Sequence, residues 1–197
     1  MIADTAIIHP NVVLGENVTI EDYCIIGSPF KGCDGAKTLI GDNAVIRAHT
    51  IIYAGNKIGN NFQTGNKANI RELNDIGDDV SIGTLSIIEH HVKIGDGVRI
   101  HSQVFIPEFS ELKTDAWIGP NVVFTNAKYP RSPDVKDKLV GPTIGVNAKV
   151  GANSTLLPGV VIGDNALIGA GSLVSKDVPD NSVAVGHPAK VVKQVSY

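Results

Sequence analysis

The chain has 197 residues, of which 43% are hydrophobic but only 5% aromatic, and its net charge is −3 at pH 7. This composition favours a single domain with a narrow aliphatic core over a globule built on large rings. The weakly negative charge, without any run of basic residues, argues against nucleic acid or an anionic membrane surface as partners.

The N-terminus and the cysteines indicate a reducing compartment. Residues 1–5 lack the charged start and apolar run of a signal peptide, and no stretch approaches about 18 uninterrupted apolar residues. Cys24 and Cys33 show no C-x-x-C spacing, so they are expected to be free thiols. We therefore expect a cytoplasmic protein.

An aliphatic residue recurs at every sixth position along nearly the whole chain. A first block is in register at Ile8, Leu14, Ile20 and Ile26, and a turn-rich loop at residues 28–39 follows. The main block then runs from Ile40 to Phe124, with Thr64 as its polar exception. After a polar loop at residues 126–142, the last hexads start at Ile144, Val150, Leu156, Ile162, Ile168 and Val174.

A period of six fits neither an amphipathic helix nor a half-buried strand. Glycine often follows the aliphatic residue, and a small or β-branched residue often comes four places after it, which is typical of a parallel β-helix with three hexads in each triangular coil. We predict an all-β fold: a β-helix of about eight coils over residues 1–184, with the two loops. Residues 185–197 are expected to cap the open end with a short helix that begins near Pro188.

Residues eighteen apart should lie on neighbouring coils, about 4.8 Å from each other. This spacing places Glu72, His90, Glu108 and Asn126 in one column. A histidine between two carboxylates is favoured as imidazolium and is oriented as a catalytic base would be. The alternative is a solvated ladder of charges that adds little stability.

A second histidine stands where the repeat uses glycine. Gly83 and Gly119 occupy this column on the adjacent coils, whereas His101 replaces the glycine and is followed by Ser102 and Gln103. A histidine beside two hydrogen-bonding side chains suggests a catalytic role. The alternative is an exposed histidine tolerated at a turn.

A metal site would need three ligands that converge at about 2 Å. The γ-class carbonic anhydrases share this kind of fold and resemble one another in an H-x4-H spacing, which His90, His91 and His101 lack. No metal is expected.

The hexads, the loop after Phe124 and the ending Gly186-His187-Pro188-Ala189 together resemble the left-handed β-helix acyltransferases that use acyl-CoA. This resemblance covers nearly the whole chain and implies a left-handed coil, acetyl-CoA as the acyl donor and a homotrimer. A narrower match at residues 119–126 and 129–131 is similar to the sugar-nucleotide N-acyltransferases that acylate 3-amino sugars.

The narrower resemblance also implies site residues. In those relatives a hexad before the phenylalanine carries polar active-site side chains, commonly Gln-Asn-Asn, and here it reads His101, Ser102, Gln103. Separately, Ile88-Glu89-His90 resembles the I-E-H segment of amino-sugar acetyltransferases whose base is a histidine. An acid usually follows that histidine, whereas His91 follows here, so His101 ranks before His90 as the expected base.

The resemblance implies acetyl transfer to the amine of a nucleotide-linked deoxyamino sugar. The base would be His101, or His90 held by Glu72 and Glu108, and the thioester oxyanion would meet Asn126, Ser102 or Gln103. The remaining implied contacts are Gly169, Ala170 and Gly171 for the pantetheine, Lys190 for a CoA phosphate, and Arg131 for the phosphates of the sugar nucleotide.

Two other functions remain open from the sequence. The same fold also acylates sugar hydroxyls, which would require a firm base. A non-enzymatic binding protein, or one like the γ-class carbonic anhydrases, is the further alternative.

Overall fold

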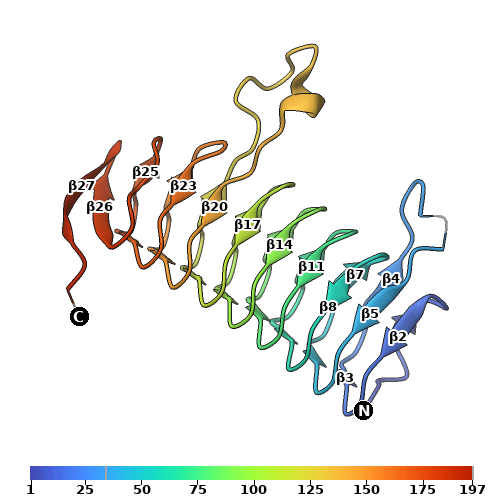
Figure 1. Ribbon diagram of the computed structural model, residues 1–197. Coiled ribbons are helices and arrows are strands. Elements are labelled where there is room, and N and C mark those ends of the chain that lie inside the picture. Colours follow the sequence, from blue (N-terminus) through green and yellow to red (C-terminus); the bar gives the residue numbers. More distant parts are fainter. Residues whose placement is uncertain (34, 197) are drawn as a thin grey trace.

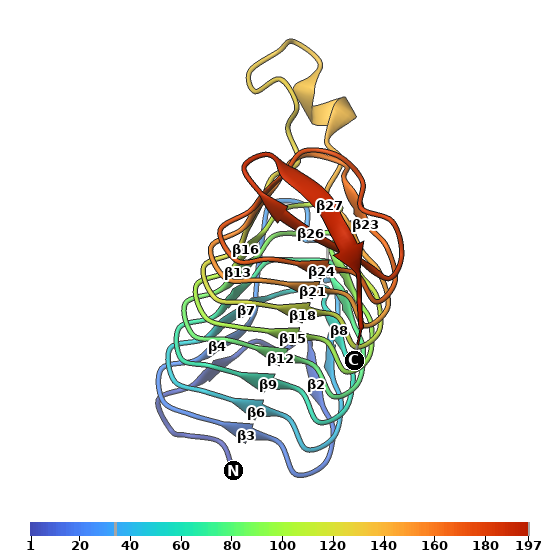
Figure 2. The ribbon, with the colours of Figure 1, turned by 90° about the vertical axis from the view of Figure 1, so that its left-hand side faces the viewer.

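A computed structural model describes residues 1–33 and 35–196. Residue 34, in the expected first loop, and residue 197, in the expected cap, lie outside the described residues. The chain forms a left-handed parallel β-helix whose coils stack along one axis and whose short strands build three sheets (Figures 1 and 2).

Each coil contributes one short strand to each sheet, and the sheets are named here in chain order. Sheet I contains nine strands: β1 (Ile7–Ile8), β4 (Ile25–Ser28), β7 (Ile51–Tyr53), β10 (Asn69–Ile70), β13 (Ile87–Ile88), β16 (Phe105–Ile106), β19 (Val123–Phe124), β22 (Thr155–Leu156) and β25 (Leu173–Val174). Sheet II contains eight: β2 (Val12–Leu14), β5 (Thr38–Ile40), β8 (Lys57–Ile58), β11 (Asp75–Ile76), β14 (Lys93–Ile94), β17 (Glu111–Leu112), β20 (Thr143–Ile144) and β23 (Val161–Ile162). Sheet III contains ten: β3 (Thr19–Ile20), β6 (Val45–Ile46), β9 (Gln63–Thr64), β12 (Ser81–Ile82), β15 (Arg99–Ile100), β18 (Trp117–Ile118), β21 (Lys149–Val150), β24 (Leu167–Ile168), β26 (Ser182–Gly186) and β27 (Ala189–Gln194).

The strand register follows the eighteen-residue coil. Ile70 pairs with Ile88, and Ile88 pairs with Ile106, in parallel. These isoleucines are fully buried, because the second residue of each of these two-residue strands points into the prism while the first points outward. Thr64, the polar exception, is also buried, and its hydroxyl accepts the Arg47 backbone N–H at 2.9 Å. The hexad pattern therefore correctly predicted the fold class and the core.

The turns between sheets form three corners, named I/II, II/III and III/I after the sheets that they join. Corner II/III holds the aspartates of the repeated I-G-D turns. Asp78 Oδ1 accepts the Asn60 backbone N–H at 2.6 Å, and Asp96 Oδ1 accepts the Asp78 backbone N–H at 2.9 Å. These carboxylates bind the backbone of the preceding coil, so their role is structural.

Both loops leave the prism at corner I/II. One connects β4 to β5; the other connects β19 to β20 and contains the 3-10 turn η1 (Val135–Lys138). Figure 1 shows both loops projecting from the same side of the coil stack. Corner I/II therefore has more chain around it than either other corner.

The expected C-terminal helix is wrong. Residues 182–194 form an antiparallel hairpin, in which β26 pairs with β24 on one side and with β27 on the other. Val191 and Val192 are β-branched and favour a strand, and the segment is short for a stable helix. Pairing also supplies hydrogen-bond partners to the backbone of β26, which would otherwise end sheet III unpaired.

Two buried asparagines tie successive turns of corner I/II together. Asn56 donates from Nδ2 to the carbonyls of Tyr53 at 2.7 Å and Arg71 at 2.8 Å, and its Oδ1 accepts the Asn74 backbone N–H at 3.0 Å. Asn74 donates to the Arg71 carbonyl at 2.8 Å and accepts the Val92 backbone N–H at 2.7 Å. The ladder therefore holds the backbone on both sides of residues 72 and 73, and also directly after residue 91.

We predict that Asn74→Ala lowers the free energy of unfolding by about 1–3 kcal/mol, because it leaves the Val92 N–H without its acceptor inside the corner. Urea denaturation followed by circular dichroism measures the change. Asn66→Ala is the matched control, since the Asn66 side chain is exposed, and it should change stability by less than about 0.5 kcal/mol. Equal effects of the two substitutions would contradict a structural role for the ladder.

Candidate functional site

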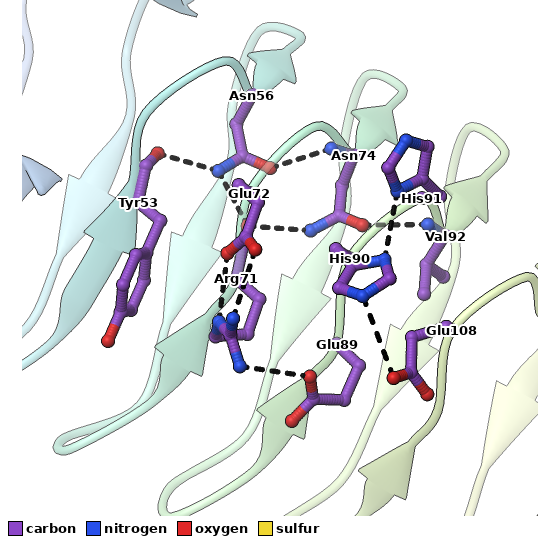
Figure 3. Close-up of polar contacts among 10 residues, drawn as sticks. All are labelled: Tyr53, Asn56, Arg71, Glu72, Asn74, Glu89, His90, His91, Val92 and Glu108. Carbon is purple, nitrogen blue, oxygen red and sulfur yellow. Dashed lines mark hydrogen bonds and ion pairs between the residues drawn. The ribbon is translucent and has the colours of Figure 1, made fainter. Parts of the chain in front are cut away.

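Corner I/II gathers a cluster of ionisable side chains on successive coils. Glu72 follows β10, His90 follows β13, Glu108 follows β16, and Asn126 follows β19. The structure thus brings this predicted column to one corner, and Figure 3 shows its central part.

His90, Glu108 and Asn126 form a chain of polar groups. Nε2 of His90 lies 3.6 Å from Oε1 of Glu108, which is longer than a hydrogen bond but short enough for an ion pair. Asn126 donates from Nδ2 to Oε2 of Glu108 at 2.7 Å and to the Glu108 carbonyl at 3.3 Å. Asn126 therefore holds the carboxylate with its other oxygen turned toward the imidazole.

Glu72 belongs to the same column but faces Arg71 instead of His90. Arg71 donates to both oxygens of Glu72, at 2.8 and 3.0 Å, and its guanidinium lies over the Tyr53 ring. Burial acts to raise the pKa of the Glu72 carboxyl, but the hydrogen bonds from Arg71 and from the backbone hold that pKa below its ordinary value. Glu72 is therefore a charged, buried anchor for Arg71.

Arg71 also reaches the next coil, where it donates to Glu89, eighteen residues later, at 3.2 Å. Burial raises the pKa of the Glu89 carboxyl, and the nearby Glu108 adds to this rise, while Arg71 opposes it. Around His90 the cluster thus has three carboxyl groups and one guanidinium. A positively charged group would be attracted to this corner.

His91 contacts His90 directly. The two Nδ1 atoms lie 2.9 Å apart, and the two rings meet edge to face. Phe109 contacts both imidazoles, at centroid distances of 5.9 and 5.7 Å. The sequence identified His91 only as a neighbour of His90. What could have drawn attention to His91 is that a histidine occupies a turn position whose φ is positive on nearly every coil.

His101 lies at corner III/I, so a single chain does not bring it together with His90. Its ring packs against Trp117 at a centroid distance of 4.7 Å, and its Nε2 is buried with no hydrogen-bond partner among the described residues. Burial, and secondarily the positive charge of Arg99, lowers the pKa of His101, which favours the neutral imidazole. Ser102 and Gln103 are exposed beside it.

Of the residues expected to contact CoA, Gly169, Ala170 and Gly171 lie on the same corner III/I as His101, on a later coil, whereas Lys190 lies in β27 of the C-terminal hairpin. At Gly169 an added Cβ would lie 2.6 Å from Cγ1 of Val185, so the C-terminal hairpin alone requires that glycine. Gly171, at φ +72°, has open space beside it, and Ala170 and Lys190 are exposed.

The loop after β19 borders a hollow at corner I/II. A cleft of about 420 Å³ lies beneath the start of this loop, and its lining includes Lys128, Leu157 and Pro158. Arg131 is exposed farther along the loop. The repeat pattern did not identify this cleft, because loop packing does not follow the six-residue period.

Within residues 1–33 and 35–196, no group of three or more His, Cys, Asp or Glu side chains is arranged to hold a metal ion. No helix in this described part of the chain is long and apolar enough to cross a bilayer.

Comparison with known proteins supports the repeat. The family model described as bacterial transferase hexapeptide (six repeats) matches residues 75–108 and 141–176. The first of these segments contains both His90 and His101.

Curated relatives align over almost the entire chain. The bifunctional protein GlmU of Clostridioides difficile (strain 630) is 31% identical over 98% of this chain, and that of Alkaliphilus oremlandii (strain OhILAs) is 33% identical over 98%. The chain spans only 39% of the length of these two relatives.

A solved structure is similar over nearly the same extent. LpxA, a UDP-N-acetylglucosamine acyltransferase from Bacteroides fragilis 9343, superposes with a TM-score of 0.63 at 21% identity, covering 98% of this chain and 74% of that one. This likeness supports the fold.

The Arg71–Glu72 pair predicts a pH-dependent stability difference. Because the folded-state pKa of Glu72 is lowered, its contribution to stability is present above the unfolded-state pKa, near 4.5, and is lost as pH falls through the folded-state value. Arg71→Met should therefore destabilise the protein at pH 7 by about 1–3 kcal/mol, and the deficit should shrink as the pH falls below about 4.5.

Urea denaturation between pH 3 and pH 8 measures this difference. Arg47→Met is the matched control, because Arg47 pairs with Glu21 at 3.3 Å where both side chains are more exposed, and it should cost less than about 1 kcal/mol. A deficit in Arg71→Met that does not vary with pH would contradict the electrostatic explanation.

Proposed function

We propose that this chain, whose six-residue repeat folds as a left-handed β-helix and matches the bacterial transferase hexapeptide model in part, transfers an acetyl group from acetyl-CoA to the amine of a nucleotide-linked deoxyamino sugar. The observation that carries this proposal is the His90–Glu108–Asn126 cluster, in which a held carboxylate faces an imidazole nitrogen. Such an arrangement suits a general base that acts on an incoming nucleophile.

The charge of corner I/II supports an amine as the acceptor. An amine arrives at neutral pH as an ammonium ion, and the carboxyl groups of Glu72, Glu89 and Glu108 at this corner favour a cation. The 3.6 Å gap between His90 Nε2 and Glu108 Oε1 leaves both atoms without a hydrogen bond to each other. One amine nitrogen would donate one hydrogen to each of them.

The proposed reaction uses these atoms in order. Nε2 of His90 takes a proton from the amine, the amine nitrogen bonds to the thioester carbonyl carbon, and Glu108 stabilises the imidazolium. The tetrahedral intermediate then expels the CoA sulfur, which takes up a proton and leaves as a thiol.

His90 replaces His101 as the first-ranked base in this proposal. Within residues 1–33 and 35–196 no carboxylate forms an ion pair with His101, and its Nε2 is buried, whereas Nε2 of His90 faces Glu108. Asn126 is committed to Glu108. Ser102 and Gln103 are therefore the proposed donors to the oxyanion.

Because these donors lie at corner III/I, the proposed site requires a second copy of the chain. The outward face of sheet I carries Ile7, Ile87 and Val123, each at least 39% exposed, between corners III/I and I/II. A homotrimer with sheet I toward its axis would bring corner I/II of one protomer against corner III/I of the next. Residues 90 and 101 are within one coil, so their heights would differ by only about 3 Å.

The groove between corner III/I of one protomer and corner I/II of the next would hold acetyl-CoA. We propose that the pantetheine runs past Ala170 and Gly171 toward the cleft at Leu157, with Lys190 near a CoA phosphate. Arg131, exposed on the long loop, would meet the phosphates of the sugar nucleotide.

Thiol release from acetyl-CoA with a panel of UDP- and dTDP-linked amino sugars tests the function. One amine should drive release, and His90→Ala should lower kcat about 100-fold or more, the scale of a lost general base. His101→Ala is the comparison variant and should have a smaller effect. Activity only with a hydroxyl acceptor would overturn the amine proposal, and a 100-fold loss confined to His101→Ala would move the base to corner III/I.

Mixing two inactive variants tests the shared site. His90→Ala removes the base from corner I/II, and the double variant Ser102→Ala, Gln103→Ala removes the donors from corner III/I. Trimers assembled from equal amounts of both should recover about a quarter of the wild-type sites, because random assembly pairs intact corners at that frequency. No recovery would indicate that each prism carries a complete site.

A further inference from the structure

We propose that His91 is a proton relay, which passes the proton taken up by His90 to solvent on the sheet II side of corner I/II. The inference rests on the proposed function of His90. It starts from the 2.9 Å contact between the two Nδ1 atoms, a distance at which one proton is shared between the rings.

The two histidines face different surroundings. Nε2 of His90 points toward Glu108, inside the cluster of Figure 3. His91 is exposed and lines a separate surface cleft of about 310 Å³, together with Lys57, Leu73 and Asp75. The pair therefore joins the proposed reaction site to an open cleft that no other step of the mechanism uses.

The contact is held from several directions. His91 has φ of +57°, the turn conformation, and the Val92 N–H that follows it is bound by Asn74. Phe109 contacts both rings. Since the backbone and the ring packing both restrict His91, its Nδ1 stays directed at His90.

The proton balance of the reaction requires such an exit. The acceptor ammonium and acetyl-CoA give the amide, the CoA thiol and one free proton. An ammonium nitrogen loses two protons in all, and the first must leave before the nitrogen can attack the thioester.

The relay moves that first proton in three transfers. The ammonium N–H proton goes to Nε2 of His90, the Nδ1 proton of His90 goes to Nδ1 of His91, and the Nε2 proton of His91 goes to water in the cleft. His90 is left with its proton on Nε2. To reset the pair, a water proton enters Nε2 of His91, the Nδ1 proton of His91 returns to Nδ1 of His90, and the Nε2 proton of His90 passes to the departing CoA sulfur. The second proton of the nitrogen goes to water, so each turnover releases one free proton.

Charged side chains lie on both sides of the histidine pair and affect these proton transfers. On the His90 side they are Glu72, Glu89, Glu108 and Arg71. On the cleft side they are Lys57 and Asp75, which share the cleft with His91. The carboxyl groups next to His90 stabilise its cationic intermediate, and the exposed Asp75 lies near the exit.

The decisive variant is His91→Asn, because asparagine suits a turn residue with positive φ but cannot take up and release a proton. With the amine acceptor, we expect kcat to fall about 100-fold, on the scale of lost acid–base catalysis, with little change in KM. Added imidazole should restore the rate of the variant and leave the wild type unchanged. His49→Asn is the matched control, since His49 has φ of +64° and stacks on Tyr23 at corner III/I, on an earlier coil.

An unchanged kcat in His91→Asn, or a loss that imidazole does not restore, would overturn the relay while the proposed function stands. A wild type inactive with every amine would instead overturn the proposed function. A readout without turnover separates the two: ¹⁵N NMR of the histidine side chains should find His90 protonated on Nδ1 and His91 on Nε2. A resting His90 protonated on Nε2 would refute the relay, because that nitrogen could not accept the proton.

Discussion

The stacking of successive coils at the strand spacing is the constraint on which the rest of this structure depends. Each two-residue strand is too short to be stable alone, and it persists because its backbone pairs with the coils on both sides while its inward aliphatic residue fills the prism. Buried isoleucines such as Ile70, Ile88 and Ile106 form continuous columns in this core. Since the period determines which residues are stacked, it also determines which outward side chains meet.

The three corners use this stacking differently. At corner II/III, aspartates such as Asp78 and Asp96 bind the backbone of the preceding coil, so their carboxylates have a structural role. At corner I/II, the buried Asn56–Asn74 ladder binds the backbone of neighbouring coils from inside the prism. The outward side chains of the same turns are thereby left free to interact with one another, and this is where the ionisable cluster is found.

Charge also separates the two histidine-bearing corners. Glu72 and Glu89 pair with the guanidinium of Arg71 and Glu108 lies next to His90, whereas burial and the charge of Arg99 lower the pKa of His101 and so favour its neutral form. A cation would be favoured at the first corner and a neutral polar contact at the second. The proposed acetyl transfer uses both properties, and the apolar outer face of sheet I between them gives a physical reason for two protomers to bring the corners together.

The six-residue period by itself determined the all-β coil, the buried aliphatic core and the places of the two loops in the repeat. It also determined two sets of neighbours, because residues eighteen apart are stacked. These are the Arg71–Glu89 contact and the column of Glu72, His90, Glu108 and Asn126. Only the tertiary structure decided the rest. Whether Glu72 faces Arg71 or His90 depends on side-chain rotamers, the Nδ1–Nδ1 contact of His90 and His91 depends on the positive φ of one turn residue, and the C-terminal hairpin depends on the unpaired edge of sheet III. Such features arise from local backbone conformation and competition among partners, to which a spacing rule is insensitive.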